Sequence, residues 1–383
     1  MGGMRVNFNA DTFDYEAEYA KIRESVKRPN ILLLGATGVG KSSVVNRLFG
    51  RRVASVGAGV PVTRGVDRYE SPELDVVLYD SEGYEIGGEG NAAFRENVLG
   101  FIDRGIASGD PAERVHEAWY CVSAANKRLT EMDVGTLREI ASRRVPTAII
   151  LTQIDGVDEE ELAALVAAIE FSCPGVPHFN TSTVEDGDAQ AVLTPYLQWE
   201  ALMDWASANL DASLREGFVS SLAGALRQKR EVAMGRVVPL YTALAATAGA
   251  VPIPIADSAL LIPIQIKMSM HIMNTFGMAS DIASVTQQFV GSEMISQIGR
   301  SLARTMTASL AKWVPLLGSV AGGLVNATVA ASFTGAMGGA VCELCYRYVQ
   351  ATVVEGRDVE VGDFFNPELI GELLKKIGGG EKK

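Results

Sequence analysis

The sequence predicts a doubly wound α/β domain with a mostly parallel sheet, followed by an all-helical domain. Apolar runs of strand length alternate with stretches of helical periodicity from about residue 28 to residue 205, which is the pattern of such a sheet. From about residue 210 the strand signals fade, and long segments rich in Ala, Gly, Ser and Met follow. Residues 1–210 hold 19 basic and 32 acidic groups, whereas residues 211–383 hold 15 and 14. We therefore expect a helical extension over residues 1–28, the α/β domain over residues 29–209 and the helical domain over residues 210–383.

The first expected element is a short amphipathic helix within residues 15–28. Tyr15, Tyr19, Ile22 and Val26 recur at helical spacing among charged residues. We expect the apolar face of this helix to pack on the α/β domain that follows.

Apolar runs of strand length come next, and each precedes a candidate ligand residue. Ligands of doubly wound sheets bind at the carboxyl ends of the strands, so these residues are expected to meet at one edge. The runs are Ile31–Leu34, Val76–Tyr79, Trp119–Val122, Thr147–Leu151 and the shorter Val176–Phe179.

A phosphate-binding loop follows the first run directly, over residues 35–42. Its glycines let backbone N–H groups turn inward around a triphosphate, at the positive end of the following helix. Lys41 is expected to reach the outer phosphates, and the Ser42 hydroxyl to hold Mg²⁺. The predicted nucleotide-binding residues of this loop are Gly35, Thr37, Gly38, Val39, Gly40, Lys41, Ser42 and Ser43.

Three further residues complete the predicted magnesium and γ-phosphate site. Asp80 follows the second run and can hold the Mg²⁺ shell, while the Gly83 amide can contact the γ-phosphate. Thr63 lies between the first helix and the second run, where a switch threonine coordinates Mg²⁺ only with triphosphate bound; the alternative is an ordinary turn threonine. We thus expect Ser42, Thr63 and Asp80 as metal ligands, and Lys41, Thr63 and Gly83 as catalytic residues.

Asp155, at the end of the stretch Thr152-Gln153-Ile154-Asp155, favours guanine as the base. A carboxylate there accepts paired hydrogen bonds from guanine N1 and the exocyclic amine, and adenine lacks this donor pair. The alternative is an ordinary loop aspartate. Ser182 follows the last apolar run, where a backbone N–H can contact the guanine oxygen. The expected cofactors are therefore GTP or GDP with Mg²⁺, and Thr152, Gln153, Asp155 and Ser182 are the expected base-side residues.

These five stretches resemble the motifs of translation-factor-class GTPases, closest to the Era-like and septin-like branch, over about residues 28–205. The loop form Gly-x-Thr-Gly-x-Gly-Lys-Ser-Ser-x-x-Asn is also similar to that of immunity-related GTPases. In the helical half, Val251–Asp257 followed by Ile264–Met268 resembles the uncharacterised helical domain that often follows Era-like domains in bacterial proteins. The resemblance implies a P-loop G domain that hydrolyses GTP to GDP and phosphate.

The sequence departs from that family pattern in three places. Thr152 and Gln153 replace the usual Asn-Lys pair beside the base, which predicts lower guanine affinity. Tyr84 stands where Ras-like enzymes place the glutamine that orients the attacking water. Gly38 stands where K⁺-activated members have an asparagine. We expect slow intrinsic hydrolysis, and the resemblance implies activation by a homodimer that forms across the nucleotide face.

An arginine finger from a neighbouring molecule is a second expectation for the missing catalytic group. Arg64, beside the switch threonine, and Arg128, after the third run, are the candidates. For each of them the alternative is an ordinary solvated surface arginine.

The helical half leaves two interpretations open. Residues 313–342 carry no charge over 30 positions, more than the roughly 20 residues that span a bilayer. They form either a buried helical hairpin or a membrane contact that involves residues 237–342. Residues 237–256 are also uncharged but contain three prolines, which do not suit a spanning helix. Lys229 and Arg230 are placed to face an anionic lipid surface or, alternatively, form a solvated helix face.

Composition restricts compartment and partners. The net charge of −12 argues against nucleic acid, because phosphate backbones are bound by Lys and Arg. Four scattered cysteines predict neither a disulfide framework nor a zinc site, and residues 1–16 lack the apolar core of a secretory signal. We therefore expect a cytoplasmic protein, with guanine nucleotide as its ligand and an anionic membrane surface as an open alternative partner.

Overall fold

The computed structural model describes residues 13–50, 60–63, 65–71, 74–81, 83, 91–249, 261–282, 322–365, 369 and 372–373. The chain divides into two compact units. One comprises residues 26–223, and the other combines residues 1–25 with residues 224–383. The predicted fold class, a mostly parallel α/β sheet domain followed by a helical region, is confirmed.

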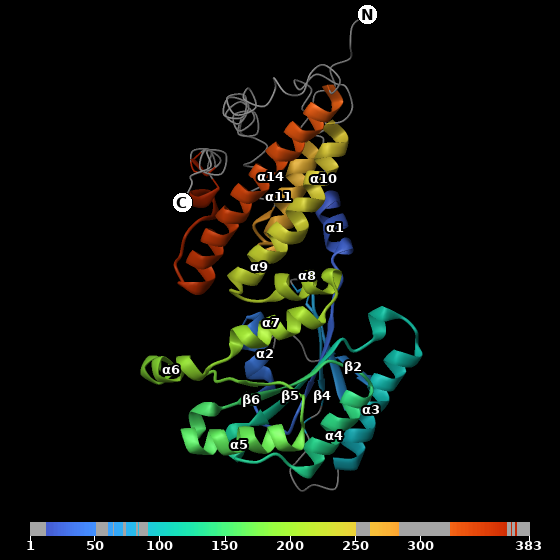
Figure 1. Ribbon diagram of the computed structural model, residues 1–383, viewed down its shortest axis with the longest axis vertical. Coiled ribbons are helices and arrows are strands. Elements are labelled where there is room, and N and C mark those ends of the chain that lie inside the picture. Colours follow the sequence, from blue (N-terminus) through green and yellow to red (C-terminus); the bar gives the residue numbers. More distant parts are fainter. Residues whose placement is uncertain are drawn as a thin grey trace, which may run out of the picture. The chain divides into compact units, whose positions relative to one another are not determined.

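A seven-stranded sheet forms the centre of the first unit, in the order β2-β3-β4-β1-β5-β6-β7 (Figure 1). The five strands from β4 to β7 in this order pair in parallel, and β2 and β3 pair antiparallel at one edge. Every residue of β1, β5 and β6 is buried, as expected for parallel strands covered on both faces. The strands are β1 (Asn30–Leu34), β2 (Val60–Thr63), β3 (Val66–Tyr69), β4 (Val77–Ser81), β5 (Glu117–Ser123), β6 (Thr147–Thr152) and β7 (His178–Asn180).

The β2–β3 hairpin was not predicted from the sequence. Its strands are four residues each, and β3 carries Asp67 and Arg68, so no continuous apolar run marks it. Thr63 pairs with Val66 across a tight turn, in which Gly65 has a φ of 78°. A left-handed residue at such a turn favours glycine. Thr63 therefore ends strand β2, in the segment before the apolar run Val76–Tyr79.

Helices cover both faces of this sheet, with α2 and α7 on one face and α3, α4 and α5 on the other (Figure 1). On the first face the Phe49, Trp119 and Phe218 rings pack together, with centroids 6.1 to 6.2 Å apart. On the other face Tyr79 packs on Phe101. The helices are α2 (Lys41–Phe49), α3 (Asn91–Ala107), α4 (Glu131–Ser142), α5 (Glu159–Ser172), α6 (Gly187–Leu193), α7 (Trp199–Asn209) and α8 (Ala212–Ser221), with 3-10 turns η2 (Pro111–Glu113), η3 (Ala124–Asn126), η4 (Ile154–Gly156) and η5 (Thr194–Tyr196).

The unit boundaries differ from those expected from the sequence. Helix α8 lies within residues 210–383, the range expected for the helical domain. It belongs instead to the first unit. The Ser221 hydroxyl accepts from the Asp75 amide at 2.7 Å, and the Ser220 hydroxyl donates to the Asp75 carboxylate at 3.1 Å. Gly217 lies so close to the Lys27 carbonyl that a Cβ would come within 2.2 Å of it. Polar contacts of this kind leave no periodic apolar signal in the sequence.

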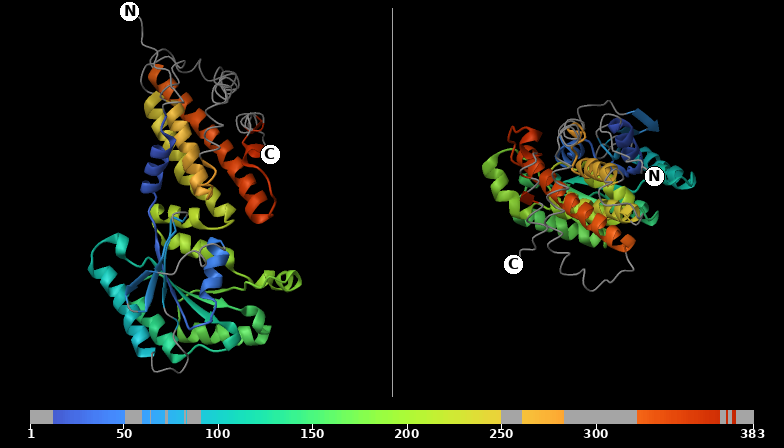
Figure 2. Two further views of the ribbon diagram at one scale, coloured as in Figure 1. Left: turned by 180° about the vertical axis from the view of Figure 1, so that it is seen from behind. Right: turned by 90° about the horizontal axis from the view of Figure 1, so that it is seen from above.

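The second unit is helical among its described residues, and α10, α11 and α14 lie side by side in it (Figures 1 and 2). Helix α14 contacts both other helices. The elements are α1 (Tyr15–Ser25), α9 (Leu226–Val232), α10 (Val238–Gly249), α11 (Leu261–Thr275), α14 (Gly322–Val349) and α15 (Val361–Phe364), with π-helical turns η6 (Ala233–Val237) and η9 (Gln350–Val354).

The N-terminal helix α1 packs on α11, and the expectation that it packs on the α/β domain is wrong. The Tyr19 hydroxyl donates to Asn274 Oδ1 at 2.8 Å, and Lys267 Nζ lies 2.6 Å from a Glu18 carboxylate oxygen. Ile22 is buried in the core of the helical unit. The amphipathic pattern correctly indicates a helix with one buried face, but it cannot indicate which unit covers that face.

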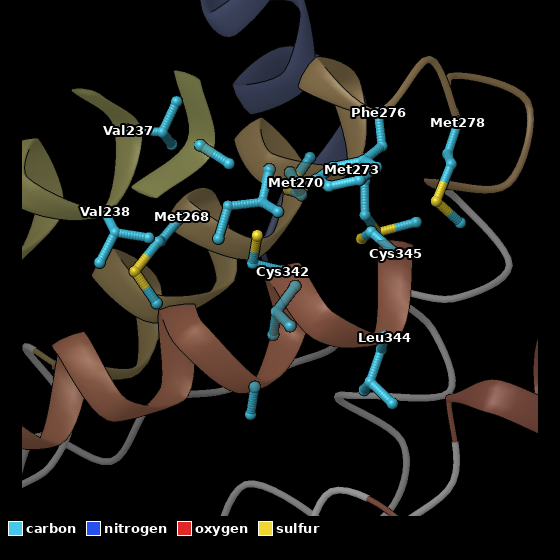
Figure 3. Packing of buried hydrophobic residues seen from close by; sticks show 14 of the residues in the cluster. Val237, Val238, Met268, Met270, Met273, Phe276, Met278, Cys342, Leu344 and Cys345 are labelled. Atoms are coloured by element: carbon cyan, nitrogen blue, oxygen red, sulfur yellow. The ribbon is translucent and has the colours of Figure 1, made fainter. Parts of the chain in front are cut away.

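The core of the helical unit is rich in Met and Cys side chains, which meet where α11 and α14 face each other (Figure 3). Gly338 of α14 packs closely on α10 and α11, since a Cβ there would come 2.7 Å from a Val238 methyl and 3.0 Å from Met268 Sδ. Small residues permit such close helix packing. Cys342 and Cys345 are buried in this core as free thiols. Lys229 is only 1% exposed and donates to the Thr275 carbonyl, so it belongs neither to a solvated nor to a lipid-facing surface.

The uncharged segment 313–342 is only partly described. Residues 313–321 lie outside the described residues, as do residues 251–257 of the family resemblance. The remainder belongs to α14. Residues 327–354 form one helical stretch that is long and apolar enough to cross a membrane by length and composition, and half of its apolar window is buried. Both interpretations of this segment remain predictions.

Candidate functional site

The phosphate loop runs from the end of β1 to the start of α2. Gly40 has a φ of 93° and immediately precedes α2, which begins at Lys41. Gly35 has a φ of 132°, and a Cβ there would come within 2.3 Å of the Cys121 carbonyl oxygen. Contact with the Cys121 carbonyl leaves no room for a side chain at Gly35, and the left-handed conformation of Gly40 favours glycine. The glycines at positions 35 and 40 therefore support the backbone conformation that turns amides toward a phosphate.

The Lys41 ammonium group lies between the loop and the end of β4. Its Nζ donates to the Gly35 carbonyl at 3.1 Å and to the Ala36 carbonyl at 3.4 Å. It also lies 4.0 Å from Asp80 Oδ1. Lys41 is thus positioned beside the phosphate loop and the predicted metal ligand together.

A pocket of ≈ 410 Å³ opens at this edge of the sheet. It brings together most of the phosphate-side residues predicted from the sequence, with Gln153 from the base side. Its lining residues are Thr37, Gly38, Val39, Gly40, Lys41, Ser42, Ser43, Asp67, Asp80, Ser81, Gly83 and Gln153.

Asp80 is suited to a metal ion. Its Oδ1 atom is buried without a hydrogen-bond partner, which is a costly state for a carboxylate oxygen. Burial raises the pKa of Asp80 to about 6; the nearby Lys41 charge opposes this shift, and the Asp67 charge adds to it. A cation beside Asp80 would supply the missing partner, and Ser42 lines the same pocket. The residues present therefore fit Mg²⁺.

The described residues contain no group of three or more His, Cys, Asp and Glu side chains that could hold a metal ion by itself. Mg²⁺ commonly binds through one or two protein oxygens together with water and substrate phosphates. This pocket therefore suits a metal that arrives with a nucleotide.

Gly83 packs directly on the phosphate loop. A Cβ at Gly83 would come 2.5 Å from the Thr37 amide nitrogen and 2.7 Å from its Cα. The predicted γ-phosphate amide thus lies against the loop that would hold the phosphates.

The predicted base-side residues lie at the carboxyl ends of β6 and β7. The Ser182 hydroxyl donates to Asp155 Oδ1, so these two residues are together. Gln153, with a φ of 55°, accepts from the Ser123 hydroxyl and donates to the Gly38 carbonyl at 3.5 Å. Asp155 does not line the phosphate pocket. It lies two residues after Gln153, which does line it.

Thr152 has a supporting position. Its side chain is buried, and its hydroxyl donates to the Val39 carbonyl and lies 3.3 Å from the Val122 carbonyl. The hydroxyl therefore joins the phosphate loop to the end of β6.

The remaining predicted residues are placed less completely. The backbone of Thr63 ends β2, but its side chain is not described. Arg64 and Tyr84 lie outside the described residues. Arg128 is exposed, two residues after η3.

Sequence reasoning missed Asp67 and Ser123. Asp67 reaches the pocket only because β3 pairs with β4, and no apolar run marks β3. The Ser123 hydroxyl donates to Gln153 and orients it. Ser123 is the last residue of β5, one residue beyond the predicted run Trp119–Val122. Its position at a strand end next to the site was a usable signal.

Comparison with known proteins supports a GTPase domain. The family model for 50S ribosome-binding GTPases matches residues 30–152, which include the phosphate loop, Asp80 and Gly83. No curated protein matches the chain. The match identifies a P-loop GTPase domain in the first half of the chain.

Solved structures that match part of the chain include a probable GTP-binding protein engB, at 17% identity and a TM-score of 0.33, covering 47% of this chain and 97% of that one. Translation elongation factor SelB from Methanococcus maripaludis, in complex with the GTP analogue GPPNHP, matches at 13% identity and a TM-score of 0.32, covering 49% of this chain and 34% of that one. A bacterial selenocysteine-specific elongation factor EF-Sec matches at 17% identity and a TM-score of 0.29, covering 49% and 29%.

Proposed function

We propose that this chain binds GTP with Mg²⁺ and hydrolyses it slowly to GDP and phosphate, as a nucleotide-controlled switch. The observation that carries the proposal is the position of Lys41 Nζ, inside the phosphate loop and 4.0 Å from a buried Asp80 oxygen that has no hydrogen-bond partner. A triphosphate with its metal satisfies both groups at once. Ser42 and Asp80, with Thr63 in the triphosphate state, are the proposed metal ligands.

Guanine selectivity is assigned to Asp155. Its carboxylate is exposed at the strand ends and is oriented by the Ser182 hydroxyl, so its remaining acceptor sites are available for the paired donors of guanine. Calorimetry should detect binding of GTP and GDP by the full chain and little binding of ATP. Equal affinity for ATP and GTP would overturn the guanine assignment.

The variant Asp155→Asn tests this residue directly. An amide donates where the carboxylate accepts, so preference should move from guanine toward xanthine nucleotides. Asp188→Asn, an exposed carboxylate in α6, is the matched control and should leave the preference unchanged. An unaltered preference in Asp155→Asn would remove this residue from the base site.

Slow turnover follows from what the site supplies. Lys41 and Gly83 both line the pocket, and in this proposal they stabilise the γ-phosphate, while Mg²⁺ would supply charge neutralisation on the phosphates. Among the described lining residues, Gln153 is the one glutamine, and its amide is held by Ser123 and Gly38. No glutamine among the described residues of the pocket is therefore left to orient water beside Gly83.

We propose that a second copy, docked through the nucleotide face, supplies the missing group. Arg128 is exposed near the ends of β5 and β6, and Arg64 is the other candidate. Phosphate release should then rise more than linearly with protein concentration, and Arg128→Ala should remove this rise if Arg128 is the finger. Constant specific activity across concentrations would contradict dimer activation.

A membrane-binding module is a second candidate function, in which the G domain controls assembly at an anionic surface. It is favoured by Leu240 and Leu244 on α10, which are 50% and 48% exposed one helical turn apart, and by the apolar stretch 327–354. The full chain should float with anionic liposomes, and Leu244→Asp should reduce flotation. Val192→Asp, at a 70% exposed apolar residue of the other unit, is the control. A wholly soluble chain under GTP and GDP would remove this candidate and leave a cytoplasmic switch.

A further inference from the structure

Asp67 lies directly opposite Asp80 in the sheet. The two residues are paired across the antiparallel strands β3 and β4, and both line the phosphate pocket. Residues paired in this way project from the same face of a sheet, with Cβ atoms about 5 Å apart. The chain therefore places two carboxylates side by side where a polyanionic nucleotide is proposed to bind.

The positive charge at this position is too small to balance them. Among the described residues that line the pocket, Lys41 is the single cation, and its ammonium hydrogens also serve the Gly35 and Ala36 carbonyls. The Asp67 side chain makes no hydrogen bond or ion pair with another described residue. Like charges directly opposite each other destabilise a sheet, and bound phosphates add further negative charge.

A divalent cation reverses the effect of Asp67. Without the cation, its charge repels both Asp80 and the phosphates; with the cation, the same charge attracts an ion that the phosphates also bind. We infer that Asp67 is a second carboxylate of the magnesium site, which increases the dependence of nucleotide binding by this chain on a divalent cation. This inference rests on the proposed function.

The position of Asp67 in the chain extends this coupling to the switch segment. Asp67 follows Val66, the residue that pairs with Thr63 across the hairpin turn. A cation attracted by Asp67 therefore holds the strand that is joined to Thr63. Loss of the ion would remove this attraction, while β3 stays paired with β4.

The test is the affinity of the full chain for GDP, measured by calorimetry in excess Mg²⁺ and in EDTA, for the wild type and for Asp67→Asn. The amide keeps the size of the side chain and removes its charge. In EDTA the variant should bind GDP on the order of tenfold more tightly than the wild type, the effect of one partly screened charge. The gain in affinity on adding Mg²⁺ should fall by about the same factor or more.

Glu70→Gln is the matched control. Glu70 is a half-exposed carboxylate just after β3, paired with Arg68 at 2.7 Å, and it does not line the pocket. It should leave the Mg²⁺ dependence unchanged. Mn²⁺ bound with GDP, followed by electron paramagnetic resonance, gives a second measurement that needs no turnover, and Mn²⁺ affinity should fall in Asp67→Asn.

An identical Mg²⁺ dependence in wild type and Asp67→Asn would overturn the inference, as would equal weakening of GDP binding with and without the ion. If Asp67→Asn unfolds, Asp67→Ser carries the same test. A wild-type chain that binds no guanine nucleotide in Mg²⁺ would refute the proposed function itself. A wild type that binds GDP equally well in Mg²⁺ and EDTA would refute the role of Asp67 alone.

Discussion

Gly83 and Thr37 are in direct contact, with no space for a side chain between them. A Cβ at Gly83 would lie 2.5 Å from both the amide nitrogen and Oγ1 of Thr37. Because the nearest atoms include backbone, they cannot move aside as the end of a flexible side chain can. The loop after β4 and the phosphate loop therefore constrain each other.

Gly83→Ala should separate the two loops and weaken binding of GTP more than binding of GDP. The added methyl group moves the Gly83 amide away from the γ-phosphate position, and only GTP carries that phosphate. Loss of one hydrogen bond to a charged group corresponds to roughly tenfold weaker binding. Calorimetry with GDP and a non-hydrolysable GTP analogue measures the difference.

Gly187→Ala is the control for this substitution, because nothing lies within 4 Å of a Cβ at Gly187. It should bind both nucleotides as the wild type does. Equal affinities of Gly83→Ala for the two nucleotides would show that the Gly83 amide does not contact the γ-phosphate.

Thr152→Val should loosen the phosphate loop without changing the volume of the side chain. The Thr152 hydroxyl donates to the Val39 carbonyl from a buried position, and a methyl group leaves that carbonyl without this partner. We expect a loss of about 1–3 kcal/mol in the free energy of unfolding, together with weaker nucleotide binding. Denaturant titration and calorimetry measure the two effects.

Thr136→Val is matched to it, since the Thr136 hydroxyl is buried without a hydrogen-bond partner. Removing an unsatisfied hydroxyl should leave stability unchanged or raise it. A similar loss of stability in both variants would show that any Thr→Val change causes it, and not the loss of the hydrogen bond to the Val39 carbonyl.

The sequence predicts the parts of the site that are local in the chain, and it misses those that depend on strand pairing. The phosphate loop is contiguous, and strands β1, β5 and β6 are buried on both faces, so both leave continuous patterns. Asp67 enters the pocket only through its register against Asp80, thirteen positions later, and the four residues of β3 form no continuous apolar run. Periodicity identifies buried faces, but it does not identify partners.

The same limit applies to α8. Its periodicity gives a helix, but its assignment to the first unit depends on Ser220 and Ser221 reaching Asp75, and on Gly217 fitting between two carbonyls. The Ser220, Ser221 and Lys27 contacts are single contacts between residues 145 or more positions apart, which no local pattern records.

Gly217→Ala should destabilise the α/β unit. A Cβ at this position would lie 2.2 Å from the Lys27 carbonyl oxygen and 2.6 Å from that of Asp75, both backbone atoms. Overpacking of this kind typically costs about 1–3 kcal/mol of stability. Gly100→Ala, in α3, meets only the end of the Arg104 side chain at 3.4 Å and should instead stabilise by about 0.5–1 kcal/mol. Thermal unfolding distinguishes them, and destabilisation of similar size in both would contradict the tight docking of α8.

Glu117 is fully buried at the start of β5, at the opposite end of the strand from the pocket. The Trp119 indole N–H donates to its Oε2 at 2.9 Å, while Oε1 has no hydrogen-bond partner. Burial raises the pKa of this carboxyl from 4.5 to about 8, and the bond from Trp119 opposes the shift. The folded chain therefore keeps Glu117 protonated at neutral pH.

Glu117→Gln should flatten the dependence of stability on pH. The folded pKa of Glu117 exceeds the unfolded pKa. The contribution of this carboxyl to the free energy of unfolding is therefore complete below pH 4.5 and is lost as pH rises through about 8. The variant keeps an acceptor for Trp119 and cannot ionise, so it should match the wild type near pH 5 and exceed it by a few kcal/mol, on the order expected for such a shift, near pH 8.5. Denaturant titrations at both pH values measure this, with the exposed Glu96→Gln as control. Parallel pH profiles for wild type and Glu117→Gln would show that Glu117 is ionised in the folded chain, with its charge compensated inside the sheet.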